Sequence, residues 1–254
     1  MRIGLVMDAS CDLPEAFVRE HDITVLPIRV DVDGQTFADR RDNAETQRFL
    51  DQELGARSHA ASTEPLEPEA VEALFLDSLV TRYDGVFCLT ITATRSPINA
   101  NVNKANAGIL THYRAAREKA GLSGPFLLRV IDTQSLFTGS AVVVAEAVRL
   151  IERDLPSAQI REQLTDLSHN AYGYLMPRDL HYLRSRARKK GDRSIGMFGA
   201  ALGSALDIKP ILRGWRGQTS PVAKLHGFES GAQALFKHVV GRIRAGLLTP
   251  TVTL

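Results

Sequence analysis

The sequence has few of the features that mark extracellular or membrane proteins. Only two of its 254 residues are cysteine. Cys11 lies near a loop and Cys88 within an apolar run, and these dissimilar settings argue against a disulfide framework or a zinc site. No run approaches the roughly 18 consecutive apolar residues of a membrane span, and the apolar run in MRIGLVMDAS is too short for a secretory signal. These absences predict a cytoplasmic protein with free thiols, no metal site and no stable membrane insertion.

The net charge is also small: the chain has 31 Lys and Arg and 29 Asp and Glu, which gives a formal net charge of +2. This balance is too even to indicate nucleic-acid binding. One local run is basic, with six positive charges and one acid, Asp192, but it has no interleaved aromatic residues for base stacking. Such a run is usually a solvated helix face, and the alternative is a docking patch for an acidic partner or a phosphate. Its basic members are Arg184, Arg186, Arg188, Lys189, Lys190 and Arg193.

Established catalytic motifs are missing as well. The chain contains no G-x-S-x-G elbow, no H-E-x-x-H pair and no Walker A run. A nucleophilic site would have to be assembled from His59, Ser62, Asp8 or Asp132, which share no such motif. A hydrolase or a small phosphotransfer enzyme therefore remains the alternative hypothesis rather than the leading one.

The first part of the chain alternates strand and helix patterns. Apolar runs at 2–7, 23–30, 84–91 and 126–131 predict strands, and helical spacing follows each of the last two. The continuous apolar character of DGVFCLTI is typical of a strand buried on both faces. We therefore predict an α/β fold whose N-terminal domain, residues 1–155, is a parallel sheet covered by helices on both sides.

Beyond residue 155 the pattern changes to helices interrupting hairpin-type strands. This predicts a second, α+β domain over residues 156–254, with the ligand cleft between the two domains. The expected order is an amphipathic helix, the short strand YGYLMP, a basic helix, a hairpin of PILRGWRG and PVAKLHG joined by QTS, a helix, and a terminal strand TVTL.

Hydroxyl-bearing loops suggest where a ligand would bind. In a parallel sheet, the loops that follow the strands line one edge, which places Asp8–Ser10, Thr92–Ser96 and Asp132–Ser135 on a common rim. A further loop, predicted over 56–66, carries Ser62 and Thr63. Hydroxyls and backbone amides can donate to an oxyanion such as a carboxylate. The alternative is that these residues only cap the helices that follow them.

An apolar segment, SIGMFGAALGSAL, lies after the basic run. It combines Gly196, Gly199 and Gly203 with larger residues that include Phe198, Leu202 and Leu206. Such a stripe either packs in a core or lines a cavity wide enough for an acyl chain. An oxyanion site above an apolar slot is the chemistry that suits a fatty acid.

Taken in order, a set of motifs resembles the DegV family of fatty-acid-binding proteins from residue 3 to about residue 240. The set is MDASCDLP, VLPIRVDVDGQTFAD, ASTEP, ITATRS, VIDTQSLFTGSA, RDLHYLR, ALGSALDIKPIL and KLHGFESGAQAL. The resemblance implies a two-domain, non-catalytic protein that needs no cofactor and holds a long-chain fatty acid between its domains. It also implies a separate fatty-acid kinase as partner, which converts the presented carboxyl group to acyl phosphate for phospholipid synthesis.

The resemblance also implies the site residues, because the family holds the carboxylate with a Thr-Ser pair and a Ser-Ser pair. The matching positions are Ala61-Ser62 and Thr92-Ala93, so one hydroxyl of each pair is kept. We expect Ser62 and Thr92 to be the donors and Thr63 and Thr94 to be replacements, and Arg95 could pair with a carboxylate or phosphate. The expected binding set is completed by Ala93, Ser10, Phe198, Leu202, Leu206 and Ile208.

Two departures from the family pattern bear on binding. The family's Leu-Ser-Gly becomes Arg95-Ser96-Pro97, which places a cation next to the expected head group. The family's C-terminal tail, with a His and a G-P-G run near the ligand carboxyl, has no counterpart before Leu254. We therefore expect that another loop takes its place or that binding is weakened.

Overall fold

The computed structural model describes residues 1–52, 54, 61–178, 183 and 208–254. Its centre is a four-stranded sheet in the order β2-β1-β6-β7, and every neighbouring pair of strands is parallel. The parallel α/β sheet predicted from the sequence is therefore confirmed. Its strands are β1 (Ile3–Asp8), β2 (Thr24–Leu26), β6 (Gly85–Thr90) and β7 (Leu127–Asp132).

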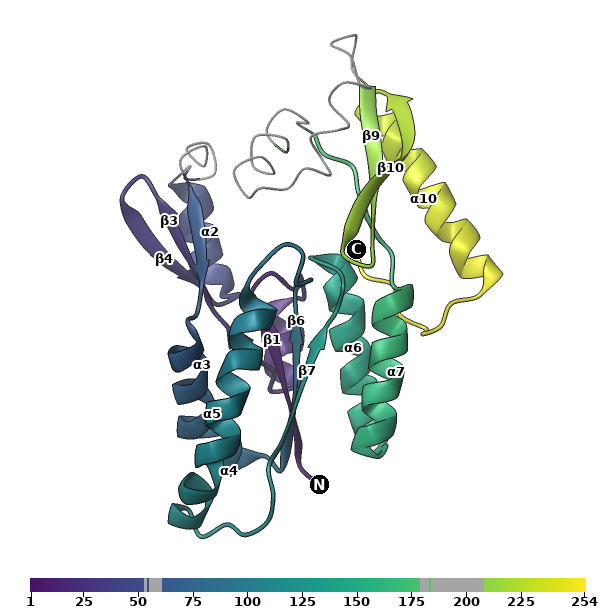
Figure 1. Cartoon of the computed structure of the whole chain (residues 1–254). Helices are drawn as coiled ribbons and strands as arrows, with labels where there is room; N and C mark the ends of the chain where they lie inside the picture. The colour runs from purple at the N-terminus through teal and green to yellow at the C-terminus, as the bar shows by residue number, and fades with distance from the viewer. Residues whose placement is uncertain (53, 55–60, 179–182, 184–207) are drawn as a thin grey trace.

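Helices cover both faces of this sheet (Figure 1). One core holds α1 (Glu15–Glu20), α6 (Thr138–Glu152) and α7 (Ser157–Asn170). The other holds α3 (Pro68–Leu74), the π-helical turn η2 (Phe75–Leu79), α4 (Val80–Arg82) and α5 (Ile98–Lys119). Because side chains alternate along a strand, Phe87 and Leu89 of β6 enter the first core while Val86 and Cys88 enter the second. This two-sided burial explains the unbroken apolar run of β6.

The apolar run 23–30 is two strands in two different sheets, not the single strand that we predicted. Thr24–Leu26 pairs with β1, whereas β3 (Ile28–Val32) lies in a separate antiparallel sheet with β4 (Gln35–Asp39). Pro27 stands between them, and its lack of a backbone N–H suits a break in the ladder. Periodicity alone does not reveal this change of sheet.

The predicted loop 56–66 is also partly wrong. Ser62–Pro65 forms β5, which pairs antiparallel with β3 and completes the sheet β4-β3-β5. Helix α2 (Asn43–Asp51) follows β4, and Asp42 caps it by accepting from the Glu45 backbone N–H at 2.8 Å. β5 consists of Ser, Thr, Glu and Pro, so its strand conformation comes from long-range pairing rather than from local propensity.

The C-terminal part forms a three-stranded antiparallel sheet, β10-β9-β8, with α10 (Phe228–Ala245) packed against it. The strands are β8 (Gly173–Leu175), β9 (Ile208–Trp215) and β10 (Gln218–His226). The predicted hairpin is present, but its turn is Arg216–Gly217 instead of QTS, which belongs to β10. Both turn residues have positive φ, 48° and 70°, as a tight two-residue hairpin connection requires.

The terminal strand predicted for TVTL is absent, since residues 251–254 have no strand assignment. Side chains of the C-terminal tail, residues 249–254, instead bond to α6. Thr249 Oγ1 donates to the buried Glu146 carboxylate, and Thr253 Oγ1 donates to the Thr138 carbonyl at 2.6 Å. The tail is thus held by two side-chain hydrogen bonds rather than by a backbone ladder.

Helix α7 bears on the boundary between the two domains. We predicted that it opens the second domain, yet its buried residues Ile160, Leu164 and Leu167 lie in the core shared with α6 and the parallel sheet. The boundary at residues 155 and 156 stays a prediction. This packing favours a boundary on the C-terminal side of α7.

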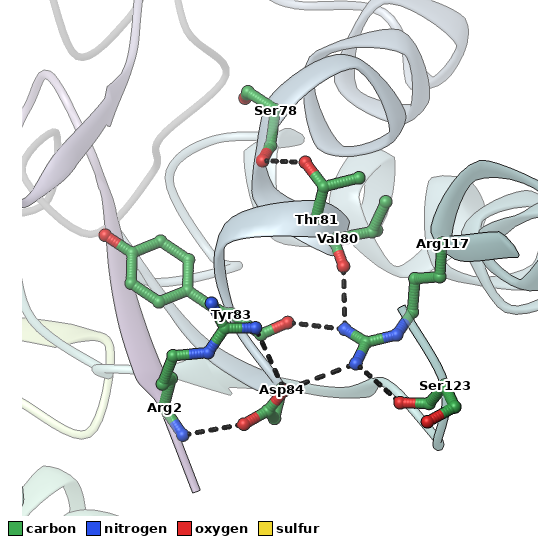
Figure 2. A network of polar contacts seen from close by, with 8 residues as sticks. All are labelled: Arg2, Ser78, Val80, Thr81, Tyr83, Asp84, Arg117 and Ser123. Atoms are coloured by element: carbon green, nitrogen blue, oxygen red, sulfur yellow. Dashed lines mark hydrogen bonds and ion pairs between the residues drawn. The ribbon is translucent and has the colours of Figure 1, made fainter. Parts of the chain in front are cut away.

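A polar network lies at the end of the parallel sheet where β1 and β6 begin (Figure 2). The nearly buried guanidinium of Arg117 donates to the Val80 and Tyr83 carbonyls, both at 2.8 Å, and to Asp84 Oδ1 at 3.2 Å. Asp84 Oδ2 also accepts from the backbone N–H of Arg2 at 2.9 Å. Through these bonds Arg117 joins α5, the end of α4 and the starts of β1 and β6.

Candidate functional site

The loops after β1, β6 and β7 meet at the carboxyl edge of the parallel sheet, as the parallel direction of the strands predicts. The backbone N–H of Ile91 donates to Asp8 Oδ2 at 2.6 Å, and that of Thr92 donates to the Ser135 carbonyl at 2.9 Å. The Ala93 N–H donates to Asp132 Oδ2 at 3.2 Å. These bonds tie the three loops into one rim.

The carboxylate of Asp8 accepts hydrogen bonds from two of the loops that form the rim. It is fully buried, and its Oδ1 accepts from both the backbone N–H and the hydroxyl of Ser10. Burial raises the pKa of Asp8, and the hydrogen bonds from Ser10 and Ile91 oppose that rise. Ser10, which we expected to bind the ligand, thus has its hydroxyl engaged by Asp8.

The hydroxyls of Thr92 and Thr94 lie next to each other on the rim, with their oxygen atoms 3.1 Å apart. Thr92 is 1% exposed, whereas Thr94 is exposed. The Thr94 hydroxyl donates to the Gly217 carbonyl in the β9–β10 turn at 2.7 Å, and the Gly217 N–H donates to the Gln134 carbonyl at 2.8 Å. The second, antiparallel sheet therefore contacts the rim at the position where the carboxylate donors were predicted.

Close packing explains why glycine occupies position 217. A Cβ atom there would lie 2.6 Å from Thr92 Oγ1 and 3.0 Å from Thr94 Oγ1, and the backbone φ is +70°. The turn is anchored on its other side by Trp215 Nε1 and Arg216 Nε, which donate to the His169 carbonyl at 3.0 and 3.1 Å. Gly217 was not among the residues predicted from the sequence, because the R-G dipeptide between two strands signals only a turn.

Arg95 also points toward the second sheet, because its Nη2 donates to Thr219 Oγ1 of β10 at 2.8 Å. The side chain is partly buried, and this burial lowers the pKa of Arg95. Its cationic group therefore lies at the junction of the rim and the hairpin.

The other expected residues are distributed differently. Ser62 is exposed and Thr63 partly buried in β5, where they lie in register with Asp31 and Val30 of β3. Their sheet is not the one that contains β6, the strand before Thr92. Ile208 is partly buried at the start of β9. The remaining apolar candidates Phe198, Leu202 and Leu206, together with the basic run at 184–193, lie outside the described residues.

Two hollows occur elsewhere on the described surface. One, of about 360 Å³, lies between α1 and the segment that leads into α2 and is lined mostly by charged residues. The other, of about 260 Å³, lies at the starts of β9 and α10. Neither is lined by Ser62 or Thr92.

Within the described ranges, no cluster of three His, Cys, Asp or Glu side chains is placed to hold a metal ion. A membrane-spanning helix would need a longer apolar stretch than any helix in the described part of the chain provides.

A parallel α/β domain whose hydroxyl-lined rim contacts an antiparallel second sheet defines a two-domain α/β protein with a candidate anion site. The DegV family model, described as an uncharacterised protein of that family, matches residues 2–253. The chain belongs to the DegV family. It is 52% identical over 252 residues to a DegV domain-containing protein of Xanthomonas axonopodis pv. citri, covering 99% of this chain and 80% of the relative.

Solved structures share the same fold. A stearic acid-binding protein from Eubacterium ventriosum superposes with a TM-score of 0.73 at 21% identity, covering 93% of this chain and 75% of the other. A DegV-family protein from Thermus thermophilus, described by its fatty-acid binding, gives 0.70 at 22% identity with coverages of 95% and 78%. DegV from Bacillus subtilis, described as a fatty acid binding protein, gives 0.71 at 18% identity with coverages of 97% and 80%. At these identities the likeness establishes the fold.

Proposed function

We propose that this protein binds a long-chain fatty acid between its two domains and holds the carboxylate with Thr92 of the rim and Ser62 of β5. The buried hydroxyl of Thr92, at the carboxyl edge of the parallel sheet, is the observation that carries the proposal. A carboxylate is an acceptor only, so it needs donors of this kind. Fatty-acid binding by solved proteins of the same family and fold supports the choice of ligand.

The charges on the rim favour one side of it for the head group. Asp8 and Asp132 are acidic and already accept backbone N–H groups, so a ligand carboxylate beside them would be repelled. Arg95 provides a cation beyond Thr92 and Thr94. We therefore place the carboxylate on the Thr92–Arg95 side, where the positive charge of Arg95 attracts it.

The acyl chain would supply most of the affinity. Burying a chain of 16 carbons stabilises the complex by about 10 kcal/mol, at about 0.8 kcal/mol per methylene, before ordering costs. Ile208 is the described member of the expected apolar lining. In this proposal the protein has no catalytic residue and no cofactor, and it works in the cytoplasm.

A separate fatty-acid kinase is the proposed partner, and it would phosphorylate the presented carboxyl group. The basic run at 184–193 carries six positive charges and one negative charge, which suits an acidic surface on the kinase. Such complementarity mainly accelerates association and selects the partner.

Native mass spectrometry of the protein expressed in bacteria tests the ligand directly. We expect a co-purified mass in the range of acids with about 14 to 20 carbons, because burial of a chain of this length retains it through purification. An empty protein that turns over an ester would instead support the alternative, a hydrolase using the same rim.

Replacing Thr92 with valine should weaken fatty-acid binding at least about tenfold, since a hydrogen bond to a charged group contributes about 1.5–3 kcal/mol. Valine keeps the shape of threonine and removes only the hydroxyl. Titration with oleate measures the change, and Ser62→Ala should act in the same direction. Thr111→Val, an exposed substitution on α5, is the matched control. Unchanged oleate affinity in Thr92→Val would reject this site assignment.

Replacing the six basic residues of the 184–193 run with glutamine should slow association with the cognate fatty-acid kinase about tenfold or more and leave oleate affinity intact. The kinase-dependent formation of acyl phosphate at low salt is the measurement. A variant of the exposed Lys104, Arg114 and Arg161 is the control for loss of positive charge. Equal rates in both variants would exclude the run as the kinase-docking surface.

A further inference from the structure

The β9–β10 turn and the predicted carboxylate donors share one chain of hydrogen bonds. Thr94 Oγ1 lies 2.7 Å from the Gly217 carbonyl and 3.1 Å from Thr92 Oγ1. The backbone N–H of Thr94 donates to Thr92 Oγ1 at 3.4 Å. The hairpin therefore meets the rim through the hydroxyls that a ligand carboxylate would use.

The donor and acceptor in each of these hydrogen bonds follow from counting the hydroxyl protons of Thr92 and Thr94. A carbonyl oxygen only accepts, so the single hydroxyl proton of Thr94 goes to Gly217. Thr94 then has no proton for Thr92, and Thr92 must be the donor in the contact between the two hydroxyls. As a result, both protons are engaged within the protein, one by Thr94 and the other by the Gly217 carbonyl.

We propose that Thr94 is a latch residue, which holds the β9–β10 turn and engages the Thr92 proton until a fatty-acid carboxylate displaces this contact. The proposal rests on the fatty-acid binding proposed above and adds a regulation of that site. A carboxylate is an acceptor only, so it competes with Thr94 Oγ1 for the proton of Thr92. Because the Gly217 backbone packs closely against Thr92 Oγ1, a head group bound at Thr92 displaces the turn and breaks the bond between Thr94 and the Gly217 carbonyl.

The neighbouring contacts confine this release to the turn. Trp215 and Arg216 remain bonded to the His169 carbonyl, and Arg95 remains bonded to Thr219, when the Thr94 contact opens. Gly217 has no side chain that would resist a shift of the turn. Its backbone lies so close to Thr92 that a ligand bound at Thr92 would move the turn. Ligand capture on the parallel sheet would thus be transmitted to the second sheet through one peptide group.

Thr94→Val tests the latch, because valine removes the hydroxyl and keeps the side-chain shape. We expect oleate to bind about fivefold more tightly, since a competing hydrogen bond of ordinary strength is removed and the Thr92 proton becomes free. Amide hydrogen exchange at Gly217 should become faster without any ligand, because the turn has lost one of its bonds. Thr94→Ser should restore both properties, and Thr111→Val is the control. In the wild-type protein, oleate should speed exchange at Gly217, and in Thr94→Val it should have no further effect.

Whether Thr94→Val binds oleate more tightly or more weakly distinguishes a latch from a residue that donates to the ligand. Weaker oleate binding in Thr94→Val would make Thr94 a ligand donor and overturn the proposal. Unchanged exchange at Gly217 in Thr94→Val, or wild-type exchange that oleate leaves unchanged or slows, would overturn it as well. If the wild-type protein binds no oleate, the proposed function fails and the ligand coupling with it. Exchange in the unliganded variants then decides separately whether Thr94 holds the turn.

Discussion

Replacing Arg117 with alanine should lower the free energy of unfolding by about 3 kcal/mol, the usual cost of removing one partner from a buried charged network. The guanidinium is nearly buried and bonds to the carbonyls of Val80, Tyr83 and Ser123 and to the Asp84 carboxylate. Alanine leaves these acceptors without their donor at the edge where several chain segments meet (Figure 2). Urea unfolding followed by circular dichroism measures the loss.

Two further variants sharpen this prediction. Arg117→Lys keeps the charge but lacks the planar set of donors, so it should recover only part of the stability. Lys119→Ala, at the exposed end of the same helix, controls for a change in helix propensity and charge. A loss below about 1 kcal/mol for Arg117→Ala would mean that water replaces the guanidinium without difficulty.

Replacing Asp8 with alanine should lower the free energy of unfolding by about 2 kcal/mol at neutral pH, because it leaves buried donors of the rim unpaired. The donors are the backbone N–H groups of Ile91 and Ser10 and the Ser10 hydroxyl. Part of this loss is offset, because the alanine variant no longer buries the charge of the Asp8 carboxylate. The same variant should also weaken oleate binding, since Asp8 holds the Ile91 backbone next to Thr92. Denaturant titration and oleate titration of one preparation measure both effects.

The pH dependence of the Asp8 contribution has a definite sign. Burial raises the pKa of Asp8 above its ordinary value of 3.8, so the native state binds the proton more tightly than the unfolded chain. The stability from this protonation is fully present below the ordinary value and is lost as pH rises through the native value. The wild-type protein should therefore lose stability relative to Asp8→Asn as pH rises above about 4. Asp77→Asn, at an exposed position, is the control. The opposite trend would mean that the bonds from Ser10 and Ile91 outweigh burial.

The parallel sheet could be predicted because its signals are local. The apolar run of β6 is long enough to indicate burial on both faces, and the hydroxyl-rich segment that follows it marks a strand-to-helix loop. Since parallel strands end on the same side, the convergence of Asp8, Thr92 and Asp132 followed from the prediction of a parallel sheet. β5 could not be predicted, because its strand conformation depends on pairing with β3.

For the candidate site, the amino-acid sequence by itself determined which hydroxyl and charged residues lie on the rim, because periodicity and loop position depend on near neighbours along the chain. Only the tertiary structure decided how those hydroxyls are used. Thr94 and Gly217 are 123 positions apart, and the bond between them exists because a hairpin of one sheet packs against the loops of another. A residue type shows that a donor is present. Which acceptor receives its proton depends on atoms that the folded chain brings within hydrogen-bonding distance, and no local pattern encodes that choice.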